Sequence, residues 1–285
     1  MAINHSYSLL DSGNGRKLEK FGSFIIDRPC AQAVWKPKFS HKDWQKAHGF
    51  FSREGEAKWL DKKKLPEFWE IEASGIRFKI SPTDFGHLGI FPEQRPFWLW
   101  MQEVIRKEKA KRGQVDVLNL FAYSGGSTLA CAKAGANVCH LDASKAIVAW
   151  ARENAAINQL SNAPIRWIID DVSKFLKREL KRERRYDAII LDPPSFGRGA
   201  KGEVFKIEEE IQDLLQACRD LLKPHPLFVL FSCHTPGFTP IAMRHLLEQT
   251  MVGYNGVIDD GEMILEGQEN VFAVPSGTYA RWQYD

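Results

Sequence analysis

Apolar runs and amphipathic stretches alternate along the chain from residue 115 onward. The apolar runs have the length of strands, and we expect strands at residues 115–121, 137–141, 165–169, 186–191 and 227–231. The stretches between them carry apolar residues at helical spacing, and we expect helices at residues 127–134, 144–158, 173–183 and 241–249. This repeated strand-then-helix order predicts an α/β domain with a mostly parallel sheet and helices on both faces.

The first 82 residues follow a different pattern. Residues 7–19 have the pattern of a strand, a glycine turn and a strand, and further short strands are expected at residues 24–27, 33–36, 69–72 and 77–80. We therefore expect a small β-rich domain over residues 1–82 and an α/β domain over residues 83–285.

Aromatic and basic residues of this β-rich domain suit two interpretations. They are Trp35, Trp44, Trp59, Trp69, Lys36, Lys38, Lys42 and Lys46. Tryptophans and lysines can stack on RNA bases and contact phosphates. They can equally be core and surface residues, and we favour the core for Trp59 and Trp69.

The most informative motif is the turn after the first strand of the α/β domain, Asn119-Leu120-Phe121-Ala122-Tyr123-Ser124-Gly125-Gly126-Ser127. Two glycines permit a tight turn, and the helix that follows offers free N–H groups to a ligand beyond the carboxyl end of the strand. Asp142 ends the next strand, 16 residues after Gly126. A carboxylate there can accept both hydroxyls of a ribose. The competing interpretation is a surface Asp that caps the next helix.

Two further strands also end in residues suited to ligand binding. Asp170-Asp171 follows the third strand, and one of the two can accept a hydrogen bond from an adenine amino group while the other caps the next helix. We assign the capping role to Asp170. The fourth strand leads into Asp192-Pro193-Pro194-Ser195-Phe196, in which two prolines make the loop rigid and Phe196 can stack on a base. An ordinary proline-rich turn is the alternative.

Together these residues resemble the class I S-adenosylmethionine-dependent methyltransferases, and in particular the bacterial large-subunit ribosomal RNA 5-methylcytosine enzymes. The resemblance implies a Rossmann-like fold with a seven-stranded sheet, whose edge hairpin falls at residues 262–265 and 270–273. It implies S-adenosylmethionine as cofactor, held by Asn119, Phe121, Tyr123, Ser124, Gly125, Gly126, Asp142, Ala143, Asp171, Val172, Asp192 and Arg95. Pro194, Ser195 and Phe196 would then bind the target base, with Asp192 and Pro193 as catalytic residues.

The resemblance extends upstream to Phe85-Gly86-His87-Leu88-Gly89-Ile90-Phe91-Pro92-Glu93-Gln94-Arg95, which is similar to the family's Gly-x-x-Thr-Gly-Phe-Phe-x-Asp-Gln-Arg segment. Gly89, Gln94 and Arg95 match, whereas Phe85, Leu88 and Glu93 depart from that segment. In all it covers about two thirds of the chain, from Phe85 onward. The RNA-binding module found at the start of some family members is not recognisable here.

Cys233 bears on the mechanism, because methylation at C5 of cytosine needs a thiolate that adds at C6. Ser232-Cys233-His234 follows the fifth strand and resembles the Ser-Cys-Ser of the 5-methylcytosine members, with His234 in place of the last serine. His234 can lower the pKa of the thiol. Cysteine is also a common buried residue, so a structural thiol is the alternative.

The amino-acid composition bears on RNA binding, on metal sites and on the cellular compartment. The 285 residues are 44% hydrophobic with a formal net charge of +3, which permits RNA binding without requiring it. Clusters of basic residues at 61–64, 106–112 and 177–185 all contain acids, so each is expected to be a solvated helix face. Five cysteines without paired spacing suit a reducing cytoplasm and suggest no metal site. No stretch is long enough to span a bilayer.

We therefore expect a cytoplasmic, S-adenosylmethionine-dependent RNA methyltransferase, a monomer or homodimer, that modifies a cytosine C5 in 23S ribosomal RNA through Cys233. The first alternative is the same fold methylating a guanine or adenine nitrogen of RNA without a covalent step. A protein that binds cofactor or RNA without catalysis is an alternative of another class, and a small-molecule or protein acceptor is also compatible with the fold.

Overall fold

The structure is a computed structural model that describes residues 7–53, 55, 57–61, 64–198, 204–267 and 269–284. The chain divides into two compact units, which are described separately. The first comprises Met1–Arg95 and Ile264–Ser276, and the second comprises Pro96–Met263 and Gly277–Asp285. The first unit thus continues beyond residue 82 and also takes in the tip of the C-terminal hairpin.

The first unit is built on a five-stranded sheet in the order β1-β2-β3-β4-β5. Its strands are β1 (Tyr7–Gly13), β2 (Arg16–Phe21), β3 (Phe24–Pro29), β4 (Gly49–Ser52) and β5 (Lys58–Trp59). A separate pair, β6 (Trp69–Ala73) and β7 (Ile76–Ile80), is antiparallel, and one short helix, α1 (His41–Trp44), precedes β4. The β-rich domain expected from the sequence is confirmed.

The strand expected at residues 33–36 is wrong. Ala33 and Trp35 instead lie across the β1–β2 turn, where their carbonyls accept hydrogen bonds from the backbone N–H groups of Gly15 and Asn14. Both N–O distances are 2.7 Å. The carbonyls of this segment thus find their hydrogen-bond donors in a turn rather than in a neighbouring strand. The pattern of apolar and polar side chains does not show which backbone group will be the donor.

The tryptophans of the first unit are tied into its fold. Trp69 is 9% exposed and donates its indole N–H to the Phe21 carbonyl at 3.0 Å. Trp59 is half-buried and donates to the Thr83 carbonyl at 2.8 Å, so the core interpretation holds for Trp69 and only in part for Trp59. The other two are half-buried, with indole N–H bonds to Ser12 from Trp35 and to Asp11 from Trp44.

The second unit contains a seven-stranded sheet in the order β10-β9-β8-β11-β14-β16-β15. Its strands are β8 (Asp116–Leu120), β9 (Asn137–Asp142), β10 (Ile165–Ile169), β11 (Ala188–Leu191), β14 (Phe228–Cys233), β15 (Gly256–Leu265) and β16 (Val274–Tyr284). The first five in the sheet order are parallel, and β16 is antiparallel to β14. The mostly parallel seven-stranded sheet is confirmed.

The edge strands differ in extent from those expected. β15 begins at Gly256, and the strand expected at residues 270–273 is wrong because β16 begins only at Val274. Asn270 has a positive φ of 67°, which marks a turn, and the Phe272 carbonyl accepts a hydrogen bond from Ser12 at 3.3 Å. A further pair, β12 (Phe196–Arg198) and β13 (Val204–Lys206), extends from the loop after β11.

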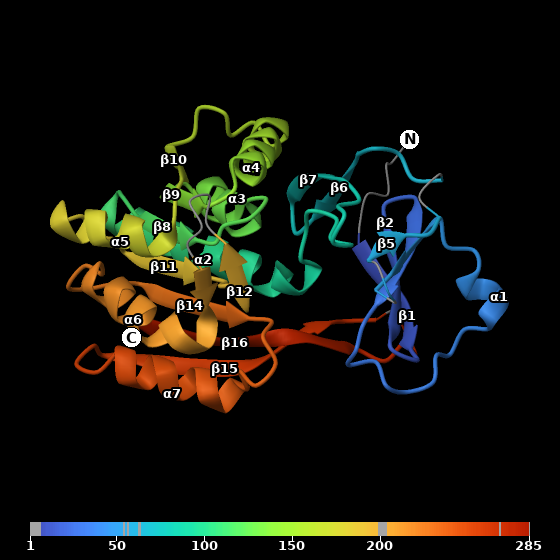
Figure 1. The fold of residues 1–285 in the computed structure, drawn as a ribbon. Helices are drawn as coiled ribbons and strands as arrows, with labels where there is room; N and C mark the ends of the chain where they lie inside the picture. Colours follow the sequence, from blue (N-terminus) through green and yellow to red (C-terminus); the bar gives the residue numbers. More distant parts are fainter. Residues whose placement is uncertain are drawn as a thin grey trace. The chain divides into compact units, whose positions relative to one another are not determined.

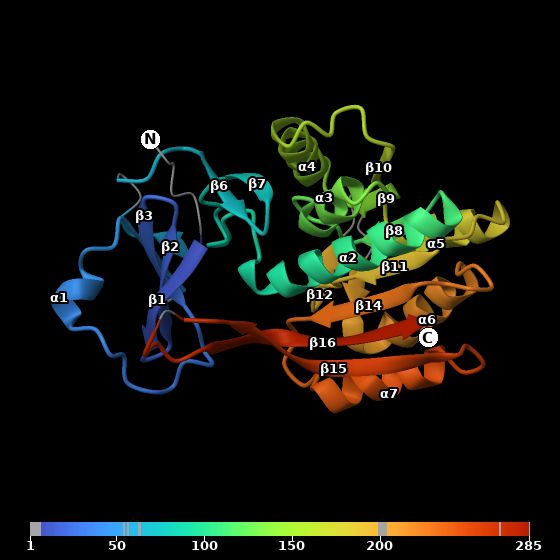
Figure 2. The same cartoon turned by 180° about the vertical axis from the view of Figure 1, so that it is seen from behind.

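Helices cover both faces of the seven-stranded sheet (Figures 1 and 2). One face carries α5 (Val172–Lys181), α6 (Ile207–Asp220) and α7 (Pro240–Thr250), and the other carries α2 (Arg95–Arg112), α3 (Gly126–Lys133) and α4 (Lys145–Ile157). The turn η1 (Pro92–Gln94) precedes α2. The core under α5 to α7 includes Phe175, Leu214 and Leu247, packed with Phe231 and Trp282 of the sheet.

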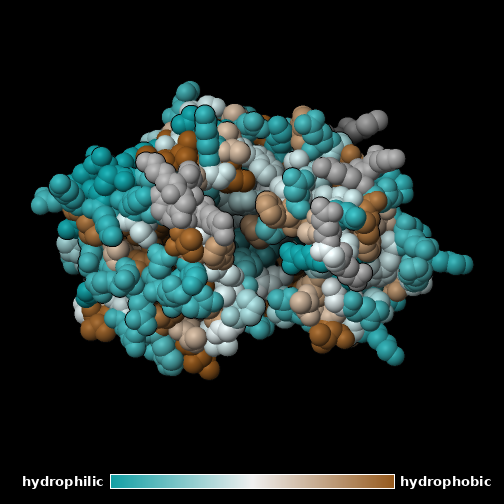
Figure 3. All heavy atoms as spheres, in the orientation of Figure 1, coloured by the Kyte–Doolittle hydropathy of each residue, from teal (hydrophilic) through white to brown (hydrophobic). Residues whose placement is uncertain are grey.

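The surface is mainly hydrophilic, with scattered apolar residues, on the face drawn in Figure 3. Among the residues that the structure describes, no helix has the length and apolar character needed to cross a membrane. Within the same residues, no group of His, Cys, Asp and Glu is arranged to hold a metal ion.

Candidate functional site

The turn between β8 and α3 has an unusual backbone. Phe121 and Tyr123 have positive φ angles of 54° and 47°, and Gly125 has a φ of 95° at the N-cap of α3. Left-handed conformations are costly for residues with a side chain and gather at functional sites. The glycine turn was visible in the sequence. The two strained aromatic residues were not, because nothing in their residue type favours this conformation.

Several of the expected cofactor residues support this turn from inside. Asn119 is 3% exposed, and its side-chain amide donates to Thr128 Oγ1 at 2.9 Å. Thr128 Oγ1 also lies 2.8 Å from His140 Nδ1. Burial lowers the pKa of His140 to about 3. Ser124 is 2% exposed, and its carbonyl accepts the Asn154 amide at 2.9 Å. These residues hold the turn in shape.

The two glycines of the turn are needed for different reasons. Gly125 supplies the left-handed residue at the helix start. A Cβ at Gly126 would lie 2.5 Å from Trp98 Cζ2, so Gly126 allows the ring of Trp98 to pack against α3. Of the two glycines, Gly125 is therefore needed for the backbone conformation of the turn. Gly126 is needed for the close packing of Trp98 against α3.

Asp142 ties this turn to the end of β9. Its Oδ2 accepts the backbone N–H of Tyr123 and its Oδ1 accepts that of Ser144, both at 3.0 Å. Burial raises the pKa of Asp142, and bonds from Ser144, Tyr123 and the exposed Ala143 oppose the rise. The capping alternative for Asp142 is wrong, because Ser144 is the N-cap of α4. The carboxylate is held with both oxygens at the strand end.

The structure corrects the capping role expected of the two acids after β10. The N-cap of α5 is Asp171, whose Oδ1 accepts the Lys174 backbone N–H at 2.9 Å. The capping role assigned to Asp170 is therefore wrong, since Asp170 instead forms an ion pair with Arg178. Val172 is 5% exposed and belongs to the core beneath. A capping carboxylate retains acceptor capacity, so an adenine contact by Asp171 stays a prediction.

The loops after β11 and β14 meet at the carboxyl ends of these neighbouring strands. Ser195 Oγ lies 2.7 Å from Thr235 Oγ1, and Asp192 Oδ1 lies 3.4 Å from His234 Nδ1. Pro193 is buried and Pro194 exposed. Phe196 is 51% exposed. We call the group Asp192 to Phe196 with His234 and Thr235 the acceptor mouth.

Cys233 lies beside the acceptor mouth but is turned into the core. It is 0% exposed, and its sulfur accepts the Thr235 backbone N–H at 3.3 Å. Burial raises the pKa of the thiol, and the opposing effects of Thr235 and of His234 do not offset it. In this arrangement the thiol is protonated at neutral pH and covered.

Arg95 belongs to the first unit. Its Nε donates to the Pro92 carbonyl at 3.0 Å, and its guanidinium lies 5.0 Å from the centre of the Tyr7 ring. Gly89 has a φ of 92°, so the matched glycine of this segment is needed for a left-handed turn. The role of Arg95 toward a cofactor stays a prediction.

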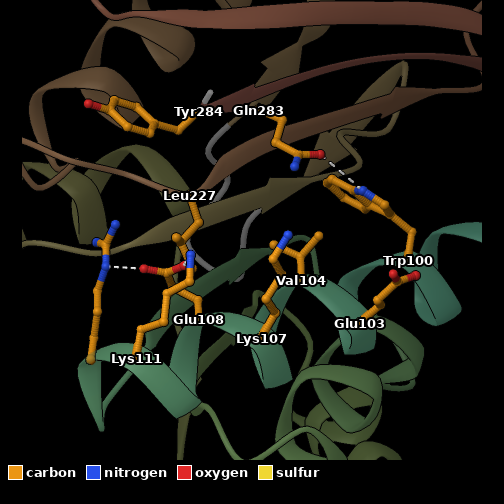
Figure 4. A pocket seen from close by; sticks show the side chains of 10 residues that line it. Trp100, Glu103, Val104, Lys107, Glu108, Lys111, Leu227, Gln283 and Tyr284 are labelled. Carbon is orange, nitrogen blue, oxygen red and sulfur yellow. Dashed lines mark hydrogen bonds and ion pairs between the residues drawn. The ribbon is translucent and has the colours of Figure 1, made fainter.

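A separate groove of about 510 Å³ lies between α2 and the end of β16 (Figure 4). Leu227 precedes β14 and Tyr284 ends the antiparallel β16, so this groove is at the amino ends of the parallel strands. Trp100 donates to Gln283 at 3.2 Å, and its ring is already packed against Phe228. The groove is thus at the opposite end of the sheet from Asp142 and Asp192.

Comparison with known proteins identifies the family. The family model described as S-adenosylmethionine-dependent methyltransferase matches residues 15–254. The chain belongs to this family. A solved S-adenosylmethionine-dependent methyltransferase from Agrobacterium tumefaciens is 38% identical, with a TM-score of 0.92 over 98% of this chain and 90% of that one.

Curated relatives include two proteins named ribosomal RNA large subunit methyltransferase K/L. The one from Hahella chejuensis is 34% identical over 58% of this chain and 22% of the relative. The one from Pseudoalteromonas atlantica is 31% identical over 70% of this chain and 26% of the relative. The chain thus spans about a quarter of the length of these relatives.

The residues at the strand ends fit S-adenosylmethionine, the cofactor of this methyltransferase family. The Asp142 carboxylate is an acceptor suited to a ribose, and the Gly125 turn places the N-terminus of α3 beside it. The half-buried Tyr123 and the capping Asp171 add an aromatic and a polar group at the ends of neighbouring strands. When bound, S-adenosylmethionine supplies a methyl group on a positively charged sulfur. The chain's part is to hold it and to present an acceptor.

Proposed function

We propose that this methyltransferase modifies a base of large-subunit ribosomal RNA in the cytoplasm. The proposal rests on the acceptor mouth, where a rigid Asp192-Pro193-Pro194 segment leads to a half-exposed Phe196 ring. A base that is flipped out of its stack needs an aromatic surface and a fixed polar group beside it. The names of the curated relatives support RNA as the acceptor.

The state of Cys233 favours transfer to a nitrogen atom of the base. A direct route needs no thiol, and Asp192 and Pro193 offer a carboxylate and a carbonyl that can orient an amine. The covalent route to C5 of cytosine needs an exposed thiolate. Cys233 is 0% exposed, and burial raises its pKa.

Methylation at C5 of cytosine is the second candidate, because Cys233 is close to the acceptor mouth. The Asp192 charge contributes to the raised pKa of the Cys233 thiol, which reflects their proximity. β11 and β14 pair with Leu191 beside Phe231, so the segments around Asp192 and Cys233 follow neighbouring strand ends. This route requires residues 233–235 to open and release the thiol.

One experiment separates the two candidates. Labelled methyl transfer from S-adenosylmethionine to ribosomal RNA is measured with wild type and Cys233→Ala, followed by nucleoside analysis. We expect a methylated purine with both proteins and no denaturant-resistant adduct on 5-fluorocytosine RNA. If 5-methylcytosine appears with wild type alone and the adduct forms, the second candidate is correct. Transfer to no RNA at all would contradict the proposal.

A further inference from the structure

Asp192 and His234 form a close pair in the acceptor mouth. Asp192 Oδ1 and His234 Nδ1 are 3.4 Å apart, with 24% of the Asp192 and 35% of the His234 side chain exposed. The pair joins two loops at the carboxyl ends of β11 and β14, which are neighbours in the sheet. In the tautomer that carries its hydrogen on Nδ1, this hydrogen is on the nitrogen that lies 3.4 Å from the carboxylate. Nε2 is then the proton-accepting nitrogen.

His234 packs closely against Gly277, and the loop that carries it is tied to β16. A Cβ at Gly277 would lie 3.0 Å from His234 Cδ2 and 2.8 Å from the Cys233 carbonyl, so only glycine leaves room for the imidazole there. Thr278 Oγ1 donates to the Phe238 carbonyl at 2.7 Å and ties the loop after β14 to β16. The imidazole is therefore held in place before any acceptor arrives.

Within the described part of the chain, the titratable groups shown beside His234 come from two strands. The Asp192 carboxylate follows β11, and the Cys233 thiol ends β14. On the β15 and β16 side, Gly277 and the end of Met263 offer no charge. Because the thiol is protonated and buried, His234 is the group of this set whose ordinary titration range lies near neutral pH.

We propose that His234 is the catalytic base of the acceptor mouth and that Asp192 orients it. This inference rests on the proposed function, and it names the residue that takes the proton from the methylated atom. Methylation of an amine needs such a residue because the product nitrogen carries a positive charge and one proton too many.

The electron and proton balance is simple. The lone pair of the acceptor nitrogen forms a bond to the methyl carbon, and the bond from that carbon to sulfur breaks with its electrons staying on sulfur. The nitrogen then gives one proton to His234 Nε2, and the N–H electrons stay on nitrogen as its new lone pair. The Asp192 carboxylate stabilises the imidazolium, which returns the proton to water after the product leaves.

The test uses two variants of the full chain, His234→Asn and His234→Ala. Asparagine can place its amide N–H where Nδ1 stands, so it can keep the contact with Asp192 but cannot accept a proton. We measure kcat, KM for ribosomal RNA and the affinity for S-adenosylmethionine from about pH 5.5 to 9, a window that includes the ordinary titration range of histidine.

For His234→Asn we expect kcat to fall by about 10²- to 10⁴-fold, the usual contribution of general base catalysis. Cofactor affinity should be unchanged. The rise of kcat with pH through the neutral range should be present in wild type and absent from His234→Asn. Added imidazole should restore part of the turnover of His234→Ala in proportion to its concentration.

Three results would overturn the inference. If His234→Asn keeps the wild-type kcat and pH profile, His234 only joins two loops. If both variants lose cofactor affinity, its role is structural. If wild type transfers no methyl group to RNA, the proposed function fails and the base assignment fails with it, so the wild-type result separates the two failures.

Discussion

We expect cofactor binding to depend strongly on Asp142, whose carboxylate is held at the end of β9. Replacing it with Asn keeps one oxygen that can accept a hydrogen bond but removes the charge, and we expect a loss of about 1.5 to 3 kcal/mol of S-adenosylmethionine binding free energy. Calorimetry measures the loss directly. Asp170→Asn is the matched control, because Asp170 follows the neighbouring strand but pairs with Arg178. Equal affinities for wild type and Asp142→Asn would contradict the ribose role.

Asp27 carries a pH dependence in the first unit. Burial raises its pKa to about 6 despite the Arg16 guanidinium 2.6 Å away. A raised folded pKa gives stability that is fully present below the unfolded pKa of about 3.9 and is lost as pH rises through about 6. We expect β2 and β3 to lose on the order of 2 to 3 kcal/mol of stability across this window.

Hydrogen exchange of the β2 and β3 amides between pH 4 and 7 measures this change. In Asp27→Asn that part of the pH dependence should disappear. The control is Asp61→Asn, whose carboxylate is 46% exposed in its contact with Lys64 and should leave the profile as in wild type. An unchanged profile in Asp27→Asn would show that another group titrates.

At the scale of one element, the β8–α3 turn gives a test that separates stability from binding. Gly125 has a φ of 95° and Gly113, after α2, has a φ of 79°. Alanine at either position adopts a left-handed conformation at a cost of about 1 to 2 kcal/mol. We expect both Gly→Ala variants to lose stability in urea, Gly125→Ala the more of the two, but only Gly125→Ala to lose affinity for S-adenosylmethionine.

Gly113 is a clean control because a Cβ there would meet no atom within 4 Å. The added methyl at Gly125 would lie 3.3 Å from Ala151 Cβ, a tight contact that adds to the strain. If Gly113→Ala loses cofactor affinity to the same extent, the turn has no special role. If neither variant does, the N-terminus of α3 does not contact the cofactor.

Helices and strands could be predicted from the sequence where the pattern of their own side chains determines the secondary structure. The five parallel strands and the helices α3, α4, α5 and α7 follow the apolar pattern, and Asp142 and Asp192 were located by their place at strand ends. The helices α2 and α6 were not predicted. Two other failures share one cause. Ala33 and Trp35 pair with a turn, and Asp171 rather than Asp170 caps α5, because a neighbouring backbone decides each case. The contact of Asp192 with His234 also arises only from the pairing of β11 with β14.

At the scale of the whole molecule, the charge predicts a modest electrostatic contribution to RNA binding. Lysine and arginine number 39 against 36 acids, and several cations of the basic clusters are already paired, as Arg178 is with Asp170 and Arg182 with Glu179. We expect the logarithm of RNA affinity to fall linearly with the logarithm of salt concentration, with a slope of about −0.7 for each phosphate contacted in single-stranded RNA.

The slope can also locate the RNA on the second unit. Arg184 and Arg185 line a cavity with Asp116 and Asn137, at the amino ends of β8 and β9, whereas the acceptor mouth is at the carboxyl ends. Neutralising both arginines as Arg184→Gln with Arg185→Gln should therefore leave the slope as in wild type. A slope that becomes shallower by about 1 or more would mean that phosphates reach the amino ends of the sheet. A wild-type affinity that does not change with salt would argue for an acceptor without phosphates, because such an acceptor releases no counterions on binding.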